Sequence, residues 1–316
     1  MVEIETINNR KDIVKNIEYG QLNGHSIVMV LKDIMRRAME EIHKRRIAFI
    51  GQVKINPHKA DPKDLVTDAD FAAQEIFVRK ITECFPGYGL VAEEKGLKLE
   101  CTIPGENLFF TVDPLDGTKA FGRRQSSGFG PMLALCNGEE VISAFVGDAM
   151  TGELYYFRPG SERAHRLNFR DMSCEQLVVN TETPLEEQYV LIRDNPLELP
   201  GFIRNVAQSR KHGGLFKEIE VQGGGIGTGM ARLWKGEIGG YVIKSGPGEA
   251  WDLMPVLGLS KQLGFIWMTF EERWRKWTQR DIKASMERTE FNEPTIIIHH
   301  SRYAEFLARA NMITDK

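Results

Sequence analysis

Four short segments of the 316-residue chain combine acidic side chains with turn residues. They are DLVTDAD (64–70), AEE (92–94), DPLDGT (113–118) and WD (251–252). In DPLDGT, the apolar run FFTV leads to Asp113 at the end of a predicted strand, because Pro114 cannot continue a ladder of hydrogen bonds. Asp116 follows, and Gly117 permits a tight turn before Thr118. We expect the two carboxylates and a backbone carbonyl of this turn to point into one cavity.

Two carboxylates held so close in a buried turn require a compensating positive charge. Buried like charges repel each other and are costly to remove from water. Mg²⁺ fits this need, because it takes oxygen ligands from carboxylates, with water and substrate phosphate completing an octahedron. If Gly117 and Thr118 open a helix, their N–H groups face a phosphate oxygen. The segment therefore predicts a metal ion and a phosphate in one site.

Each acid taken alone has a simpler structural interpretation. Asp70 and Asp252 could each cap a helix, and the acids of AEE could lie solvated on the surface. Asp113 together with Asp116 is different, because a turn at a strand end has few structural reasons to carry both acids. The four segments as a set therefore favour a metal site.

Other catalytic chemistries find little support in the sequence. The chain has no GxxxxGK[ST] loop, no GxSxG elbow and no HExxH motif. The glycine run GGGIGTG (223–229) lacks the GxGxxG spacing, and we interpret it as close packing of a helix or turn. No covalent nucleophile is needed to explain the pattern of acids.

The segments DLVTDAD, AEE, VDPLDGTKAF and GEAWDLMP, in that order, resemble the inositol monophosphatase family, within the Mg²⁺-dependent, lithium-sensitive phosphatase superfamily. The resemblance spans roughly residues 28–312. It implies about two or three Mg²⁺ ions as cofactors. The implied metal ligands are Glu93, Asp113, the Leu115 carbonyl, Asp116 and Asp252.

The resemblance also implies which residues act on water and substrate. Thr118 and Asp70 would orient or activate the attacking water, and Glu93 would help to hold that water. Substrate contacts are expected from Asp116, Gly117, Thr118, Ser245 and Glu249. Of these, Ser245 and Glu249 precede the WD segment and would line the leaving-group pocket, although both could equally be turn residues. The implied enzyme is a phosphoric monoester hydrolase.

The substrate is less well defined than the chemistry. Hydrolysis of an inositol-1-phosphate-type substrate is our first interpretation. Lys119 after DGT, and Gly246–Pro247 before Asp252, also resemble the branch that hydrolyses 3'(2'),5'-bisphosphate nucleotides such as adenosine 3',5'-bisphosphate. In that branch an acid usually follows the lysine, whereas this chain has Ala120. A non-enzymatic alternative is an inactive metal-binding or scaffold homologue, yet all the acids are present.

The family resemblance implies a layered αβαβα sandwich of the inositol monophosphatase and fructose-1,6-bisphosphatase type. It would comprise an α+β N-terminal half and an α/β C-terminal half, with the site between them. We expect an N-terminal extension (1–24), a half carrying most metal ligands (25–160), and a half carrying Asp252 and the leaving-group pocket (161–316). Local patterning alone supports a mixed α/β fold.

Hydrophobic periodicity predicts the elements of this fold. Helices are expected at 27–46, 68–84, 199–208, 225–234, 251–263 and 303–310. Strands are expected at 89–92, 108–112, 132–135, 141–147 and 154–157, forming one sheet over residues 88–160, and then at 177–180, 189–193, 241–244 and 295–299. The charged segment 270–294 is interpreted as a surface helix or hairpin anchored by Trp274 and Trp277, in preference to a nucleic-acid contact.

The composition and net charge of the chain limit the kinds of partner that it can bind. A net charge of −3, from 41 basic and 44 acidic residues, provides no general attraction for nucleic acid or an anionic membrane. No apolar stretch approaches the roughly 18 residues of a membrane span, and the N-terminus lacks a signal-peptide pattern. Four widely spaced cysteines suit a reducing compartment. We therefore expect a cytoplasmic protein that binds a small phosphorylated metabolite; the family resemblance adds a homodimer.

Overall fold

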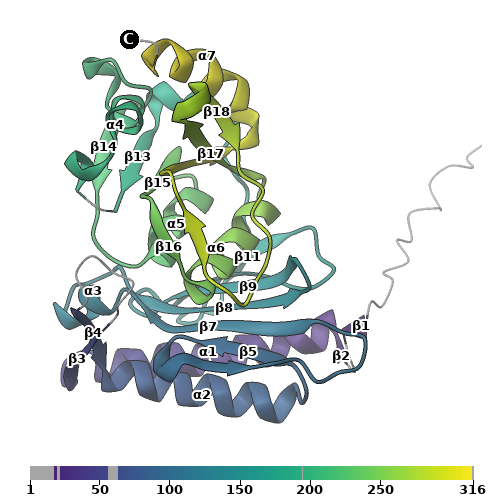
Figure 1. Ribbon diagram of the computed structural model, residues 1–316. Coiled ribbons are helices and arrows are strands. Elements are labelled where there is room, and N and C mark those ends of the chain that lie inside the picture. The colour runs from purple at the N-terminus through teal and green to yellow at the C-terminus, as the bar shows by residue number, and fades with distance from the viewer. Residues whose placement is uncertain (1–17, 20–21, 56–62, 194, 315–316) are drawn as a thin grey trace, which may run out of the picture.

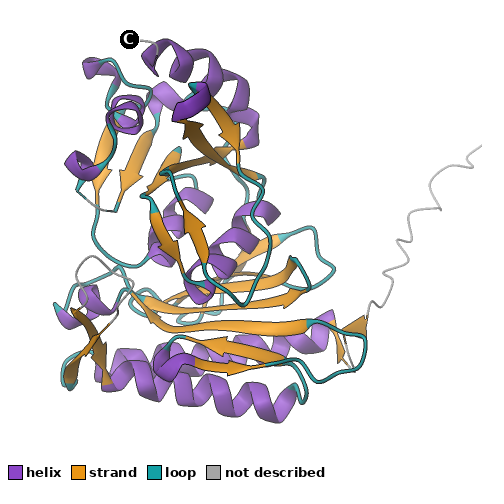
Figure 2. Ribbon diagram, in the orientation of Figure 1, coloured by secondary structure: helices purple, strands orange, loops and turns teal. Residues whose placement is uncertain are grey.

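Helices and sheets alternate in five layers (Figures 1 and 2). The computed structural model describes residues 18–19, 22–55, 63–193 and 195–314. In Figure 1, α1 and α2 lie below the first sheet, α5 and α6 lie between the two sheets, and α4 and α7 cover the far side of the second sheet. The expected αβαβα sandwich is therefore confirmed.

The first layer consists of two long amphipathic helices, α1 (Gly24–Arg45) and α2 (Asp68–Cys84). Asn23 caps α1, because its side chain accepts a hydrogen bond of 3.0 Å from the Ser26 N–H. The apolar stripe of α1 is buried at Ile34, Met35, Ala38 and Ile42. Beside these helices lie the short strand pairs β1 (Glu18–Tyr19) with β2 (Leu22–Asn23) and β3 (Gly51–Ile55) with β4 (Lys63–Thr67). Most of the expected N-terminal extension, residues 1–24, lies outside the described residues.

The first sheet has eight strands in the order β12-β11-β10-β9-β8-β7-β5-β6. Their bounds are β5 (Gly89–Ala92), β6 (Leu97–Leu99), β7 (Leu108–Asp116), β8 (Gly130–Asn137), β9 (Glu140–Asp148), β10 (Glu153–Phe157), β11 (Ala164–Asn168) and β12 (Cys174–Gln176). Only β5 and β7 pair in parallel; the other pairs are antiparallel. Every residue of β7 is buried, since helices cover both faces of the sheet. The strand that ends in the acidic turn is thus enclosed along its whole length.

The middle layer contains α5 (Ile226–Trp234) and α6 (Ala250–Gln262). The side chains of Leu253, Met254 and Leu257 from α6 join the apolar core shared with Phe109 of β7. The adjoining short helix α3 (Thr118–Gly122) follows directly after β7. The end of β7 and the start of α6, which both carry acidic residues, therefore meet inside the molecule.

The second sheet has six strands in the order β14-β13-β15-β20-β17-β18. They are β13 (Tyr189–Ile192), β14 (Glu218–Val221), β15 (Gly240–Ile243), β17 (Phe265–Glu271), β18 (Lys276–Gln279) and β20 (Thr295–His299). The strands β14, β13 and β15 are parallel. The outer helices are α4 (Gly201–Ala207) and α7 (Tyr303–Thr314), and β16 (Gly246–Gly248) pairs with β19 (Thr289–Phe291). Six 3-10 turns complete the described elements: η1 (Glu94–Gly96), η2 (Leu185–Glu187), η3 (Pro196–Glu198), η4 (Arg210–His212), η5 (Glu272–Trp274) and η6 (His300–Arg302).

The structure departs from the expected elements at several points, and it contains strands that the sequence did not predict, among them β3, β4, β6, β11, β12 and β14. Residues 177–180 are not a strand, because the first sheet continues past residue 160 and ends with β12 just before them. The change of sheet thus falls between Gln176 and Tyr189, beyond the expected division at residue 160. The apolar run of β17, which the sequence interpretation left out, forms the hairpin with β18. In that hairpin Trp277 is buried but Trp274 is 62% exposed, so only one of the two tryptophans anchors it.

Helices of membrane-spanning length and hydropathy are absent from the part of the chain that the structure describes.

Candidate functional site

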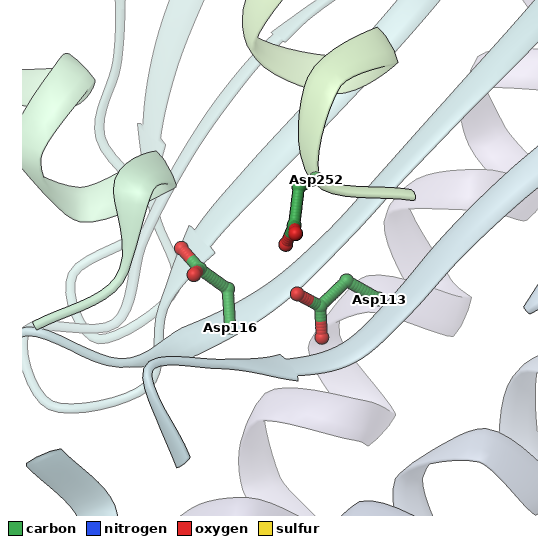
Figure 3. Close-up of side chains that lie close together, drawn as sticks. All are labelled: Asp113, Asp116 and Asp252. Carbon is green, nitrogen blue, oxygen red and sulfur yellow. The ribbon is translucent and has the colours of Figure 1, made fainter. Parts of the chain in front are cut away.

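Three carboxylates converge where β7 ends and α6 begins (Figure 3). Asp113 and Asp116 come from the end of β7, and Asp252 comes from the first turn of α6. One carboxylate oxygen of each residue lies within 4.8 Å of the others. Asp113 and Asp116 are 1% and 6% exposed, and Asp252 is half-buried. Three of the expected metal ligands therefore lie close enough to contact one cation, and their binding of a metal stays a prediction.

A local irregularity of β7 aims two acids at the same point. The pairing of β7 with β8 shifts between Asp113 and Asp116, so the strand bulges at Pro114 and resumes, whereas the sequence predicted that it ends there. The Leu115 N–H donates a 2.8 Å hydrogen bond to Asp113 Oδ1, which fixes that carboxylate. Gly117 then takes a left-handed φ of 87°, and a Cβ there would lie 2.3 Å from the Gly128 carbonyl oxygen. Only glycine fits this turn.

The glycine run after β14 holds Asp116. The Asp116 carboxylate accepts hydrogen bonds from the N–H groups of Ile226 (3.0 Å) and Gly227 (2.7 Å) at the start of α5. A Cβ on Gly225 would lie 2.2 Å from Asp116 Oδ2. The interpretation of this run as close packing is confirmed, but the sequence did not reveal that the packing partner is Asp116.

The electrostatics of the cluster fit a hard divalent cation. Burial raises the pKa of Asp113 well above its usual range, and the charges of Glu93, Asp252 and Asp116 raise it further. Burial likewise raises the pKa of Asp116 to about 6, although the Gly227 N–H and the charge of Arg193 act in the opposite direction. Burial and neighbouring acids raise the pKa of Asp252 to about 7. These three crowded carboxyl groups resist ionisation, and a bound Mg²⁺ ion would balance the negative charge of their ionised forms.

Asp70 is buried beside this cluster at the start of α2. One of its oxygens, Oδ2, accepts hydrogen bonds from the Thr67 N–H (2.7 Å) and hydroxyl (2.6 Å), so Asp70 belongs to the helix cap, as one interpretation held. Its other oxygen, Oδ1, lies 3.1 Å from the Thr118 hydroxyl. Burial, followed by the charges of Glu93 and Glu94, raises the pKa of Asp70 to about 7. The capping and the functional interpretations therefore describe different oxygens of one carboxylate.

Glu93 and Glu94 follow β5. Glu93 is not one of the three acids whose carboxylate oxygens lie within 4.8 Å of one another. Its charge nevertheless raises the pKa of both Asp70 and Asp113. Its N–H donates a 3.1 Å hydrogen bond to the Val112 carbonyl, which ties the AEE loop to β7. Glu94 is 3% exposed, so the interpretation of that acid as solvated is wrong.

Gln74 holds the AEE loop in place, and the sequence analysis missed it. Its Nε2 donates to the Glu94 carbonyl oxygen and its Oε1 accepts from the Glu94 N–H, both at 2.8 Å. Gln74 is buried on α2, four positions after Asp70. A polar residue on the apolar face of a predicted helix was the signal that pointed to a buried partner.

Ser245 and Glu249 flank β16 in the connection to α6. Ser245 is exposed and Glu249 is half-buried at the N-cap position of α6, three residues before Asp252. Arg193, which the sequence analysis did not single out, follows directly after β13, and its charge lowers the pKa of Asp116 and Asp252. The second half of the chain therefore adds both signs of charge to the region around the three acids.

Residues 25–303 match the inositol monophosphatase family. The inositol-1-monophosphatase of Bacillus subtilis is 26% identical over 224 residues, which is 67% of this chain and 75% of that protein. A solved IMPase/NADP phosphatase complexed with NADP and Ca²⁺ superposes with a TM-score of 0.67 at 18% identity, covering 91% of this chain and 96% of the other. An IMPase/NADP phosphatase complexed with Mg²⁺ and phosphate gives 0.61 at 18% identity, covering 90% and 94%. These likenesses agree with the five layers and the acidic centre, and the chain belongs to the inositol monophosphatase family of phosphoric monoester hydrolases.

Proposed function

We propose that this protein is a Mg²⁺-dependent phosphomonoesterase that hydrolyses a small phosphorylated metabolite, with an inositol-1-phosphate-type compound as its substrate. The convergence of Asp113, Asp116 and Asp252 carries the proposal. Three mostly buried carboxylates with raised pKa values are unfavourable in a structural core unless cations balance them. The same arrangement is what phosphoryl chemistry at a metal site requires.

About two or three Mg²⁺ ions would be held by Asp113, Asp116, Asp252 and Glu93, together with the Leu115 carbonyl oxygen. When bound, these ions supply positive charge to the phosphate and make water more acidic. Support comes from the donor chemistry and from the relative whose structure contains Mg²⁺ and phosphate. The Thr118 hydroxyl lies 3.0 Å from the Leu115 carbonyl oxygen and 3.1 Å from Asp70 Oδ1, and its single proton can be donated to only one of them at a time.

Thr118 and Asp70 would place and deprotonate the attacking water. The Thr118 hydroxyl donates toward Asp70 Oδ1, so its oxygen can accept a hydrogen bond from water. Oδ1 of Asp70 would receive the proton through Thr118, since a pKa near neutrality suits a general base. Glu93, next to the same cluster, would help to hold the water in line. No phosphorylated enzyme intermediate is required.

The phosphate itself would lie against Gly117 and Thr118. Gly117 is the N-cap residue of α3, so the first N–H groups of that helix have no partner within it and would donate to the phosphate. Asp116 would contact the leaving group, and Ser245 and Glu249 would border it from the connection before α6. In this arrangement the leaving group faces the C-terminal half.

A bisphosphate nucleotidase is the second candidate. Arg193 favours it, because a cation beside the acids suits a leaving group that carries its own phosphate. The relative solved with NADP binds a phosphorylated nucleotide. An inactive scaffold is disfavoured, because all the expected acids are present and three of them converge.

The remaining parts of the proposal concern the protein's setting. We place the protein in the cytoplasm, a reducing compartment that suits its four free cysteines. A homodimer and inhibition by lithium follow from the family resemblance. Gel filtration with light scattering tests the first, and a lithium titration of activity tests the second.

The deciding experiment is a panel of phosphomonoesters assayed with Mg²⁺. Inositol 1-phosphate, adenosine 3',5'-bisphosphate, fructose 1,6-bisphosphate and histidinol phosphate would be compared by phosphate release. EDTA should abolish turnover, and excess Mg²⁺ should restore it. Asp113→Asn should lose Mg²⁺ binding and turnover together, whereas Asp33→Asn, on the exposed face of α1, should retain both. Turnover that survives chelation, or an active Asp113→Asn enzyme, rejects the proposal.

A further inference from the structure

The charged segment 280–293, here named the strap, crosses between the two halves of the molecule. It starts in the second half, after β18, where the Arg280 N–H donates a 2.8 Å hydrogen bond to the Trp267 carbonyl oxygen of β17. It then reaches the first half, because the Ala284 N–H donates a 2.8 Å hydrogen bond to the Glu139 carbonyl oxygen in the turn between β8 and β9. Ala284 is buried, so this contact is shielded from water. The strap therefore joins the two sheets.

The end of the strap is paired with the connection that leads to Asp252. In this pairing β19 lies antiparallel to β16, with Thr289 opposite Gly248 (Figure 1). A Cβ on Gly248 would lie 2.7 Å from Phe291 Cε2, so the ring of Phe291 packs directly against this glycine. Phe291 is buried and stacks on Trp267, with 6.3 Å between the ring centroids. Because Gly248 is four positions before Asp252, the strap holds the chain just ahead of that acid.

The middle of the strap contacts the hairpin that carries Glu93. The Lys98 ammonium donates a 2.6 Å hydrogen bond to Glu287 Oε1, although the two residues are 189 positions apart. Lys98 belongs to β6, which pairs with β5, and Glu93 lies in the loop between these two strands. Both side chains of the ion pair are exposed, so the pair is weak by itself and sensitive to salt. It nevertheless places the strap against the loop of a second acid.

Glu93 and Asp252 come from opposite halves, so their spacing depends on how the halves are held together. Between Glu287 and Phe291 the strap contacts the hairpin of the first acid and the connection of the second. We propose that the strap is a positioning element, which holds this hairpin and this connection at the spacing where both acids would bind Mg²⁺ at one centre. The inference rests on the proposed Mg²⁺-dependent function. Residues of the strap would act through the backbone that they hold, as supporting residues around a metal site do.

Hydrogen exchange of the metal-free protein tests the link without a bound ion. Glu287→Gln removes the charge that pairs with Lys98, so the amides of residues 93–99 should exchange about two- to fivefold faster, the range that an exposed ion pair can supply. Glu100→Gln is the matched control, because Glu100 also lies 3.2 Å from the Lys98 ammonium but belongs to the same stretch of chain as the hairpin. It should leave the exchange unchanged. Lys98→Glu combined with Glu287→Lys reverses the pair and should restore protection.

Calorimetric titration with Mg²⁺ measures the consequence for the acids. Phe291→Ala removes the ring that packs against Gly248 and should weaken Mg²⁺ binding by about tenfold. Glu287→Gln should weaken it by up to about fivefold. Phe306→Ala removes an equally buried ring from the outer core beneath α7, so it should lower the Tm but keep the affinity for Mg²⁺.

The results separate the strap from the proposed function. Unchanged exchange at residues 93–99 in Glu287→Gln overturns the link to the hairpin. Unchanged Mg²⁺ affinity in both Glu287→Gln and Phe291→Ala overturns the positioning role, and so does an equal loss in Phe291→Ala and Phe306→Ala, because the effect then follows general destabilisation. A wild-type protein that binds no Mg²⁺ would reject the proposed function, while hydrogen exchange would still decide whether the strap holds the hairpin.

Discussion

The hydroxyl of Thr118 lies 3.1 Å from Oδ1 of Asp70, although the two residues are 48 positions apart. Each residue lies at the start of a helix, α3 for Thr118 and α2 for Asp70. Because Thr67 occupies the other oxygen of Asp70, Oδ1 is left to interact with Thr118. A hydrogen bond thus joins the two helix starts, and in the proposed reaction this pair would accept the proton of the attacking water.

Replacing the Thr118 hydroxyl should slow the reaction without weakening substrate binding to the same degree. Thr118→Val keeps the shape of the side chain but removes the group that links water to Asp70, so we expect kcat to fall roughly 100-fold at saturating Mg²⁺. Thr118→Ser retains the hydroxyl and should keep most of the activity. Steady-state kinetics of both variants test this, and a Thr118→Val enzyme with a normal kcat would show that the hydroxyl takes no part.

Metal-free protein should lose stability as the pH rises. Asp70 and Asp252 have a pKa of about 7 and Asp116 of about 6, above the usual 3.8, so the folded state binds more protons than the unfolded state between those values. The free energy of unfolding therefore falls as the pH rises from about 4 through 7. Thermal unfolding in EDTA between pH 5 and pH 8 measures this slope.

Added Mg²⁺ and the substitution Asp252→Asn should each reduce the loss of stability at high pH. Mg²⁺ binds the ionised carboxylates, so it should raise the Tm more at pH 8 than at pH 5. Asp252→Asn removes one buried ionisation and should flatten the slope of the metal-free protein. A metal-free Tm that is level or rises over this range contradicts the assignment of these pKa values.

Gly225 should not tolerate alanine. A methyl group there would lie 2.2 Å from Asp116 Oδ2 and must push the carboxylate out of the cluster. We expect Gly225→Ala to weaken Mg²⁺ activation by roughly tenfold or more, as disruption of the groups around a ligand does. Gly201→Ala is the matched control, because a Cβ there meets nothing within 4 Å. Equal Mg²⁺ dependence of activity in the two variants would show that Asp116 is not part of the metal site.

Gln74 should act as a positioning residue for Glu93. In Gln74→Glu the carboxylate cannot donate to the Glu94 carbonyl, and it adds a negative charge beside the AEE loop. The Mg²⁺ concentration for half activation should rise about tenfold, with kcat largely recovered at saturating Mg²⁺. Gln176→Glu, exposed on the edge strand β12, is the control. A fall in kcat that Mg²⁺ does not relieve would indicate structural damage instead of lost positioning.

Much of the site is already evident in local sequence. Asp113 and Asp116 share one turn, and the backbone of Pro114 and Gly117 restricts that turn strongly enough to predict where both carboxylates point. The stripes of α1 and α2 and the buried run of β7 likewise follow from side-chain periodicity. Short-range patterns failed at residues 177–180, because whether an apolar run becomes a strand depends on a free sheet edge.

The sequence by itself determined which acids are available, the turn that pairs two of them, and the alternation of helices and strands, since these depend on neighbours within a few residues. Only the tertiary structure decided that Asp252 meets the turn of β7, that the glycine run holds Asp116, and that Arg193 acts on the same acids. These relationships join residues 59 or more positions apart in the sequence. Their geometry depends on how the five layers stack, because buried apolar faces set the distance between layers and no local pattern encodes that distance.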